Sequence, residues 1–193
     1  MANFTPGDSI KKFSEETRWL SNFWPSPVRA TLFGRSEIWP SAENLYQASK
    51  LAHSNLTEAE KMVYFEEFLT VSPGQSKRRG SEFELNESWL EARLEVMEAV
   101  VTHRFQSNFE DYNKLADIDG VFIEEGNSWG DIFWGVDEET REGENNLGLI
   151  LMDLAGELNR ERSREMAEPG LIDPLFWTEG YKEFYLNLDS IIQ

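Results

Sequence analysis

The sequence has no cysteine and only two histidines, His53 and His103, among its 193 residues. A disulfide scaffold, a thiolate nucleophile and a cysteine-ligated zinc are therefore excluded. Two histidines also leave almost no material for a histidine-rich metal site or for a Ser-His-Asp triad. The sequence thus predicts no metal centre.

Long apolar runs are missing as well. The longest stretch, Leu147 to Leu154, is interrupted by Asp153 and is too short to span a bilayer. The N-terminus shows no apolar run after a basic segment, so no signal peptide is expected. These patterns predict a soluble, cytoplasmic protein that does not enter a membrane.

Basic residues are scarce, with 18 Lys and Arg against 36 Asp and Glu and a formal net charge of -18. A chain this acidic repels phosphate backbones at long range, so non-specific nucleic-acid binding is not expected. The plainest role of the charge is a solubilising surface. Any phosphorylated ligand would need a local cationic pocket, which makes the few clustered basic residues informative.

Aromatic residues are plentiful, with seven Trp and thirteen Phe. That apolar content indicates a folded core, and the length suits one domain with a short extension. The patterns predict a mixed α+β fold, a single mostly helical domain with small β-hairpins. One hairpin is expected at 28–38 with Gly34 at its bend, and a second at 121–136 turning at 126–128. Helices are expected at 41–53, 57–72, 88–101, 108–116 and 147–160.

The first cluster of candidate residues lies on the helix that begins at Ser41. Glu43, Gln47 and Lys50 have the spacing of one helix face. Glu43 also lies in the first turn, at the positive end of the helix dipole. A carboxylate, an amide and an ammonium in line could bind a polar ligand. The alternative is an ordinary solvated helix face.

The second cluster is a glycine-punctuated segment from Glu125 to Gly135. It carries the acids Glu125 and Asp131 together with Trp129 and Trp134. Aromatic rings beside acids suit stacking on a flat base while a carboxylate acts on a sugar. The alternative is a hairpin whose tryptophans pack inward and whose acids cap turns.

Two smaller features complete the set. Lys77, Arg78 and Arg79, in a loop or short helix, could hold a phosphate through charge-assisted hydrogen bonds, or could be a solvent-exposed basic segment. Asn145 stands at the start of the last helix, where capping would explain it. A Rossmann fingerprint, a P-loop and a kinase signature are absent.

In this order the segments resemble the NADAR superfamily, also called the YbiA-like N-glycosidases. The resemblance runs from about Phe13 to Leu158, and the later part of the chain, 161–193, is a C-terminal extension expected to pack on the domain at 10–160. The matching motifs are Trp19-Leu20-Ser21-Asn22-Phe23, Trp39-Pro40-Ser41-Ala42-Glu43 with Tyr46-Gln47 and Lys50, Trp89 with Arg93 and Met97, Glu125-Gly126-Asn127 with Trp129-Gly130-Asp131, and Gly143, Asn145 and Leu147-Gly148.

The resemblance implies a cofactor-free hydrolase of N-glycosidic bonds. The substrates it suggests are phosphoribosylamino-pyrimidine intermediates of riboflavin biosynthesis or ADP-ribose attached to guanine bases. A small ribosylated base, phosphorylated, is therefore the expected partner. The sequence does not reveal the base or the oligomeric state.

Such a cleavage passes through an oxocarbenium-like ribose, so a carboxylate must stabilise that charge or activate water. The catalytic candidates are Glu43 and Asp131, with Glu125 as a third. The substrate-binding candidates are Asn22, Gln47, Lys50, Lys77, Arg78, Trp89, Trp129, Trp134 and Asn145.

Two other classes of function remain open at this stage. The domain could bind an ADP-ribose-like nucleotide without cleaving it, or it could be an interaction protein that uses its acidic surface and aromatic tail. A buried Glu43 locked by core hydrogen bonds would favour the interaction protein.

Overall fold

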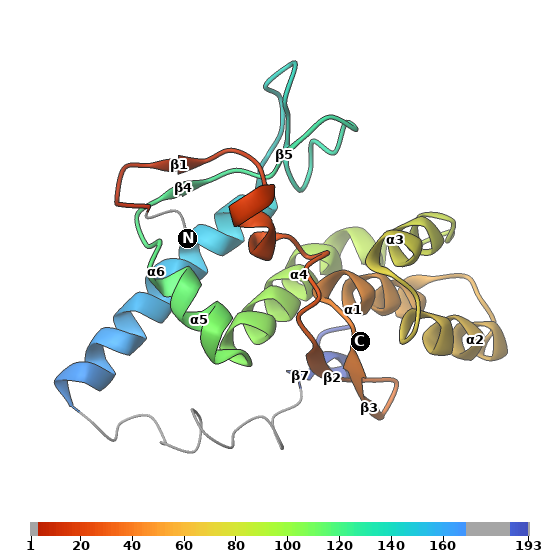
Figure 1. Ribbon diagram of the computed structural model, residues 1–193. Coiled ribbons are helices and arrows are strands. Elements are labelled where there is room, and N and C mark those ends of the chain that lie inside the picture. Colours follow the sequence, from red (N-terminus) through yellow and green to blue (C-terminus); the bar gives the residue numbers. More distant parts are fainter. Residues whose placement is uncertain (1–3, 169–185, 193) are drawn as a thin grey trace. The chain divides into compact units, whose positions relative to one another are not determined.

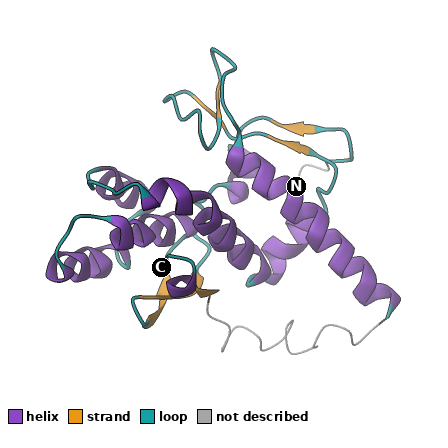
Figure 2. Cartoon of the chain, turned by 180° about the vertical axis from the view of Figure 1, so that it is seen from behind, coloured by secondary structure: helices purple, strands orange, loops and turns teal. Residues whose placement is uncertain are grey.

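The computed structural model describes residues 4–168 and 186–192. Helices dominate and the strands are short (Figures 1 and 2), so the predicted mixed, mostly helical α+β class is confirmed. The chain divides into two compact units, each built from two separate stretches. The first unit comprises Met1–Ser21 and Phe105–Lys182, and the second comprises Asn22–Arg104 and Glu183–Gln193.

A three-stranded sheet anchors the second unit. Strands β2 (Val28–Leu32) and β3 (Arg35–Trp39) form the predicted hairpin, with Val28 opposite Trp39. Phe33 and Gly34 form its two-residue turn, and both have positive φ, 53° and 70°. This is the geometry that matches the twist of paired strands. The third strand, β7 (Leu186–Asn187), runs parallel to β2 and leads into the short helix η4 (Leu188–Ser190).

The helices of the second unit follow the hairpin directly. The predicted N-cap Ser41 accepts a hydrogen bond from Asn44 N at 3.2 Å and opens α1 (Ala42–Ser49). The helix tightens into η2 (Lys50–His53) and so ends at His53, as expected. The remaining helices are α2 (Glu58–Phe68), α3 (Pro73–Ser81) and α4 (Ser88–Gln106), of which the residues up to Arg104 belong to this unit.

Local capping explains where α2 and α3 begin. Thr57 and Glu60 form a reciprocal capping box at α2, as the sequence predicts. Ser72 and Gln75 form a second box, with proline at the first helical position. The basic residues from Lys77 to Arg79 therefore lie on a helix, one of the two alternatives that the sequence left open.

The core of the second unit is aromatic and aliphatic. Trp39 and Phe65 are both fully buried, and their ring centroids lie 5.1 Å apart in an edge-to-face arrangement. Burying side chains of this size stabilises the fold by about 2 to 3 kcal/mol each. Leu45 of α1 is also fully buried, so it fixes α1 against this core. This packing sets the orientation of the polar residues on α1.

The first unit is built around two packed helices, α5 (Phe109–Ala116) and α6 (Asn146–Ala167). The Tyr112 hydroxyl donates to Leu158 O at 3.1 Å, which joins them. Helix α6 runs through the predicted boundary at residue 160. Strand β1 (Ser9–Ile10) and helix η1 (Glu15–Leu20) precede α5, and β4 (Phe122–Ile123) lies between α5 and α6 in the sequence. Strand β1 pairs with β4 in parallel.

The predicted hairpin at 121–136 is wrong. Strand β5 (Gly126–Asn127) pairs with β6 (Val136–Asp137) in parallel, and residues 132–134 form a turn. The backbones approach so closely that a Cβ on Gly135 would lie 2.1 Å from the Glu125 carbonyl oxygen. The glycines therefore serve backbone packing rather than a hairpin bend.

None of the helices in residues 4–168 and 186–192 combines the length and apolar character needed to cross a membrane. The predicted C-terminal extension is described only in part. Its aromatic stretch, 176–185, lies outside the described residues.

Candidate functional site

Glu43 is held at the start of α1 with only 5% of its surface exposed. Its backbone N–H donates to Asn22 O at 3.0 Å. Its Oε1 accepts a hydrogen bond from Gln47 Nε2 at 2.7 Å, one helical turn away. Glu43 and Gln47, which were predicted to share one helix face, are thus in direct contact. The Glu43 carboxylate is nearly buried rather than solvated.

Asn22 and Gln47 each keep a buried amide oxygen without a hydrogen-bond partner among the described residues. The other end of the Asn22 amide, Nδ2, donates to the sulfur of Met97 at 3.1 Å. Buried polar atoms usually form hydrogen bonds, so a buried acceptor without a partner is unusual and is a candidate for ligand binding. Asn22 Oδ1, on a residue bonded to Glu43, could accept a hydrogen bond from a ligand hydroxyl.

The Lys50 ammonium lies over two aromatic rings, those of Tyr46 and Trp89. Its Nζ is 5.7 Å from the ring centroid of Tyr46 and 5.9 Å from that of Trp89, and it donates to Gly80 O at 3.4 Å. A cation over aromatic faces is stabilised by the ring quadrupole. The ammonium is therefore held in place only two helical turns from Glu43.

Trp89 is a support for Lys50 and is itself buried, with 5% of its surface exposed. Its ring packs 5.3 Å from Tyr46 and 5.4 Å from His53, centroid to centroid. His53 Nδ1 lies 2.7 Å from the Ser88 hydroxyl, and burial lowers the pKa of His53 below its ordinary value. A direct contact of Trp89 with substrate stays a prediction.

The two basic candidates on α3 point to different places. Lys77 Nζ lies 5.8 Å from the ring centroid of Phe23, the neighbour of Asn22. Arg78 instead lines a cavity of about 250 Å³ between α2 and α3, together with Glu67, Gln75, Arg79 and Glu82. Lys77 is therefore the better placed of the two to reach a phosphate near Asn22.

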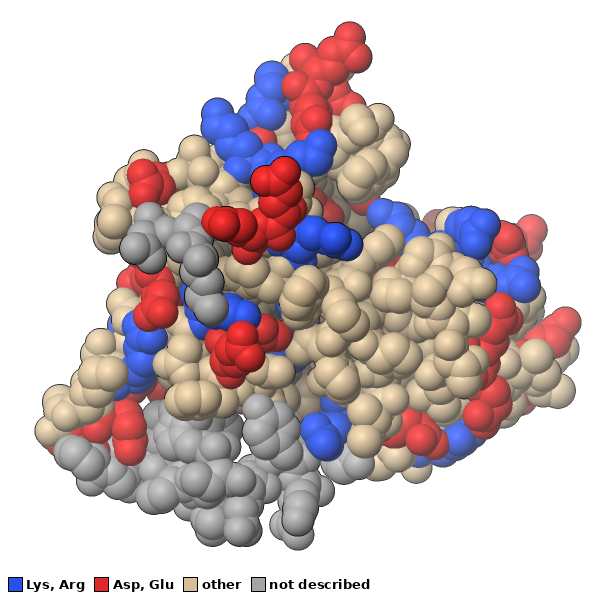
Figure 3. Space-filling model, viewed as in Figure 1, with Lys and Arg blue, Asp and Glu red and all other residues tan. Residues whose placement is uncertain are grey.

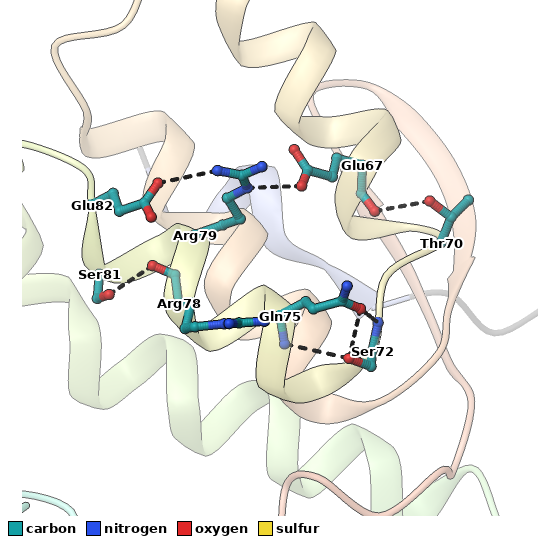
Figure 4. A network of polar contacts seen from close by, with 8 residues as sticks. All are labelled: Glu67, Thr70, Ser72, Gln75, Arg78, Arg79, Ser81 and Glu82. Atoms are coloured by element: carbon teal, nitrogen blue, oxygen red, sulfur yellow. Dashed lines mark hydrogen bonds and ion pairs between the residues drawn. The ribbon is translucent and has the colours of Figure 1, made fainter.

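The cavity beside Arg78 is already balanced in charge. Figure 4 shows Arg79 between two carboxylates, with Nε 2.8 Å from Glu67 and Nη1 3.4 Å from Glu82. Gln75, which also lines the cavity, bonds Ser72 in the capping box of α3. The Arg79–Glu67 pair joins α3 to α2, and the balance of charges gives the cavity little attraction for an anion.

In the first unit the predicted second cluster is organised by Asn127, which is fully buried. Its Nδ2 donates to Asp131 O at 2.8 Å, and its Oδ1 accepts from Asp131 N at 3.0 Å and from Trp129 N at 3.3 Å. The Asp131 carboxylate in turn accepts from Trp134 N at 3.0 Å. Asp131 thus caps a turn, the plainer of the two alternatives, and its catalytic role stays a prediction.

The aromatic residues of this loop differ in exposure. Trp129 is 64% exposed, so a ligand can reach part of it from solvent. Trp134 is half-buried and packs edge-to-face on Phe133 at 4.8 Å. Trp129 is therefore the better stacking candidate of the two.

The Asn145 side chain contacts the backbone of Glu125. Asn145 has the left-handed φ of 55° at the N-cap of α6, yet its side chain makes no capping bond. It instead accepts from Glu125 N at 3.0 Å and donates to Ile123 O at 2.9 Å. The expectation of a capping side chain is therefore wrong, because the amide joins α6 to the segment that carries Glu125.

Tyr46, His53 and Gly80 are among the residues of the second unit that were not predicted for the site: Tyr46 and His53 pack on Trp89, and Gly80 contacts Lys50. Tyr46 precedes Lys50 by four positions, a spacing that could have found it. His53 and Gly80 are brought in by tertiary packing, for which the sequence holds no local signal.

Charges on the face seen in Figure 3 are mixed, with Lys and Arg interspersed among Asp and Glu. Within the described ranges, His, Asp and Glu side chains form no group of three or more suited to a metal ion.

Comparisons with known proteins show which family the chain belongs to. The NADAR domain model matches residues 10–159. The NMR structure of the E. coli protein YbiA is similar at 26% sequence identity with a TM-score of 0.65, covering 86% of this chain and 91% of that one. No curated protein matches the sequence. Because the matched region spans most of its length, the chain belongs to the NADAR domain family.

Proposed function

We propose that this protein is a hydrolase that cleaves the N-glycosidic bond between a ribose, or ribose phosphate, and a nitrogenous base. The observation that carries the proposal is Glu43, a nearly buried carboxylate bonded to Gln47 of α1, with Lys50 at the start of η2. A carboxylate locked into the core would favour the interaction protein, but Asn22 and Gln47 beside it keep buried amide oxygens with no hydrogen-bond partner among the described residues, which a closed core network would satisfy. Family membership agrees with it, since the family resemblance implies this reaction.

In this reaction the bond between the anomeric carbon and the base nitrogen breaks, and its electron pair leaves with the base. Positive charge develops on the ribose ring, and a water molecule adds to the anomeric carbon and loses a proton. Glu43 either stabilises the ribose charge or accepts the proton of water. The departing base takes up a proton, so the products are a free sugar and a free base.

The surrounding groups suit the rest of such a substrate. Asn22 Oδ1 is a buried acceptor on a residue bonded to Glu43, and it would bind a ribose hydroxyl. Lys50 and Lys77 are the cations that would bind a phosphate, each at a defined place beside an aromatic ring. A charged group bonded in this way contributes about 1.5 to 3 kcal/mol.

The test is a turnover assay on a small panel: phosphoribosylamino-pyrimidine intermediates, NAD, ADP-ribose and ADP-ribosylated guanosine. Free base and ribose phosphate are followed by mass spectrometry. The matched variant is Glu43→Gln, whose amide oxygen can still accept the hydrogen bond from Gln47. We expect turnover of one substrate class, and a loss of roughly a hundredfold or more in kcat in the variant.

Two outcomes would contradict the proposal. Near-wild-type turnover by a folded Glu43→Gln variant would remove Glu43 from the chemistry. Tight binding of a panel member without any release of base would instead favour the non-catalytic nucleotide-binding module.

A further inference from the structure

Helix α3 meets α1 at Gly80, which is buried. A Cβ added to Gly80 would lie 1.9 Å from Gln47 Oε1 and 2.8 Å from Gln47 Cδ. Both distances are far below any real contact, so a side chain at position 80 and the Gln47 amide cannot occupy their places together. The amide holds its position only because residue 80 is glycine.

That amide position places a hydrogen-bond donor on Glu43. Gln47 Nε2 donates to Glu43 Oε1 at 2.7 Å, whereas Gln47 Oε1 has no hydrogen-bond partner among the residues described. One hydrogen bond alone leaves the amide free to swing about its side-chain torsions. Packing against Gly80 supplies the second restraint.

The same glycine contacts the cation of the site. The Gly80 carbonyl oxygen accepts from Lys50 Nζ at 3.4 Å. Gln47 of α1 and Lys50 at the start of η2 therefore both meet this residue of α3. Glu43, on the same helix face, accepts a hydrogen bond from Gln47.

We propose that Gly80 is a positioning residue for the N-glycosidase reaction, an inference that rests on the proposed function. Its missing side chain keeps the Gln47 donor on Glu43, and its carbonyl keeps Lys50 on the same side of the helix. Position 80 acts on the reaction through these two side chains and touches no substrate itself.

The test compares Gly80→Ala with Gly74→Ala, a matched control on the same helix where a Cβ meets nothing within 4 Å. Alanine suits a helix better than glycine, and the closest atoms to be displaced belong to the flexible end of Gln47, so both variants should fold. Thermal unfolding checks this.

The first readout is independent of activity. The side-chain amide signals of Gln47 in a ¹⁵N–¹H spectrum are assigned by their loss in Gln47→Ala. We expect them to shift and to exchange faster with solvent in Gly80→Ala, and to be unchanged in Gly74→Ala. Unchanged Gln47 signals in Gly80→Ala would overturn the proposal, whether or not the protein proves to be an enzyme.

The second readout is kinetic. We expect Gly80→Ala to lower kcat roughly 10- to 100-fold, the effect of losing a hydrogen bond to a charged group, with KM changed less than about threefold. In a Gln47→Ala background the same change should lower kcat by less than about threefold, because the two residues act as one unit. Equal losses in both backgrounds would show that Gly80 does not act through Gln47.

Failure of the two proposals can be told apart. A wild-type protein that cleaves nothing contradicts the proposed function, while the spectrum still decides whether Gly80 positions the Gln47 amide.

Discussion

At the scale of single residues, Asp131 has a structural role in a turn, whereas its catalytic role stays a prediction. Its Oδ1 accepts from Trp134 N, and its backbone is bonded at both ends to the Asn127 side chain. These bonds explain why an acid stands at this turn. These bonds need an acceptor oxygen in the place of Oδ1, which an asparagine side chain would also supply. They do not depend on the negative charge of Asp131, whose role is left to experiment.

A pair of variants separates the two roles. Asp131→Asn keeps an oxygen for Trp134 N, so we expect its free energy of unfolding to stay within about 1 kcal/mol of wild type. If the charge takes part in catalysis, as the sequence predicts, kcat falls at least roughly tenfold. Asp131→Ala should lower both kcat and stability. Urea unfolding and the turnover assay give the two quantities, and full activity in Asp131→Asn would leave Asp131 as a turn residue only.

Prediction from sequence succeeds for residues related by helical spacing. Glu43 and Gln47 lie one turn apart, so their contact follows once the helix is recognised. Gly80 is 33 positions beyond Gln47, and its role depends on how α3 packs on α1. Asn145 was expected to cap its own helix, yet its amide binds Ile123 and Glu125 instead. Side chains that act at long range cannot be assigned before the fold is known.

At the scale of secondary structure elements, the hairpin of β2 and β3 depends on a distant residue. Phe33 has a φ of 53°, which is unfavourable for a bulky side chain. The Asp189 carboxylate accepts hydrogen bonds from Phe33 N at 2.6 Å and Gly34 N at 2.7 Å. The hairpin leads directly into α1 and Glu43, so this clamp helps to fix where the candidate site begins.

Asp189→Ala tests the clamp. We expect a loss of about 1 to 3 kcal/mol in the free energy of unfolding, because two charge-assisted hydrogen bonds to the backbone disappear. The amide protons of Phe33 and Gly34 should also exchange faster with solvent. The control is Ser190→Ala, which removes only an exposed bond to Asn187 O. Unchanged stability and exchange in Asp189→Ala would show that the carboxylate contact is incidental.

Element boundaries follow the sequence where a local cap sets them. Ser41 and the Thr57–Glu60 box mark helix starts as predicted. Local sequence signals do not predict the segment 121–136, because its strands pair in parallel and its turn is set by the buried Asn127 side chain. Two-residue strands carry too few residues for an alternating pattern to show.

At the scale of the whole molecule, protonation of the many carboxylates and protonation of the two buried histidines have opposite effects on the free energy of unfolding as the pH falls. With a net charge of -18, protonation of carboxylates relieves repulsion within the folded chain. The two histidines act against this. Burial lowers the pKa of His103 to about 4, and burial also lowers the pKa of His53. Both therefore take up protons more readily in the unfolded chain.

The contribution of His103 can be isolated by comparing wild type with His103→Gln. The folded pKa lies below the unfolded value of 6.5, so its stabilising effect is complete above pH 6.5 and is lost as the pH falls toward 4. Between pH 8 and pH 5.5 wild type should lose about 1.4 kcal/mol more stability than the variant, measured by urea unfolding at constant salt. Carboxylate titration is common to both proteins and cancels in the difference. Parallel stability curves would mean that His103 takes up its proton without unfolding, and that the surroundings of α4 admit the charge.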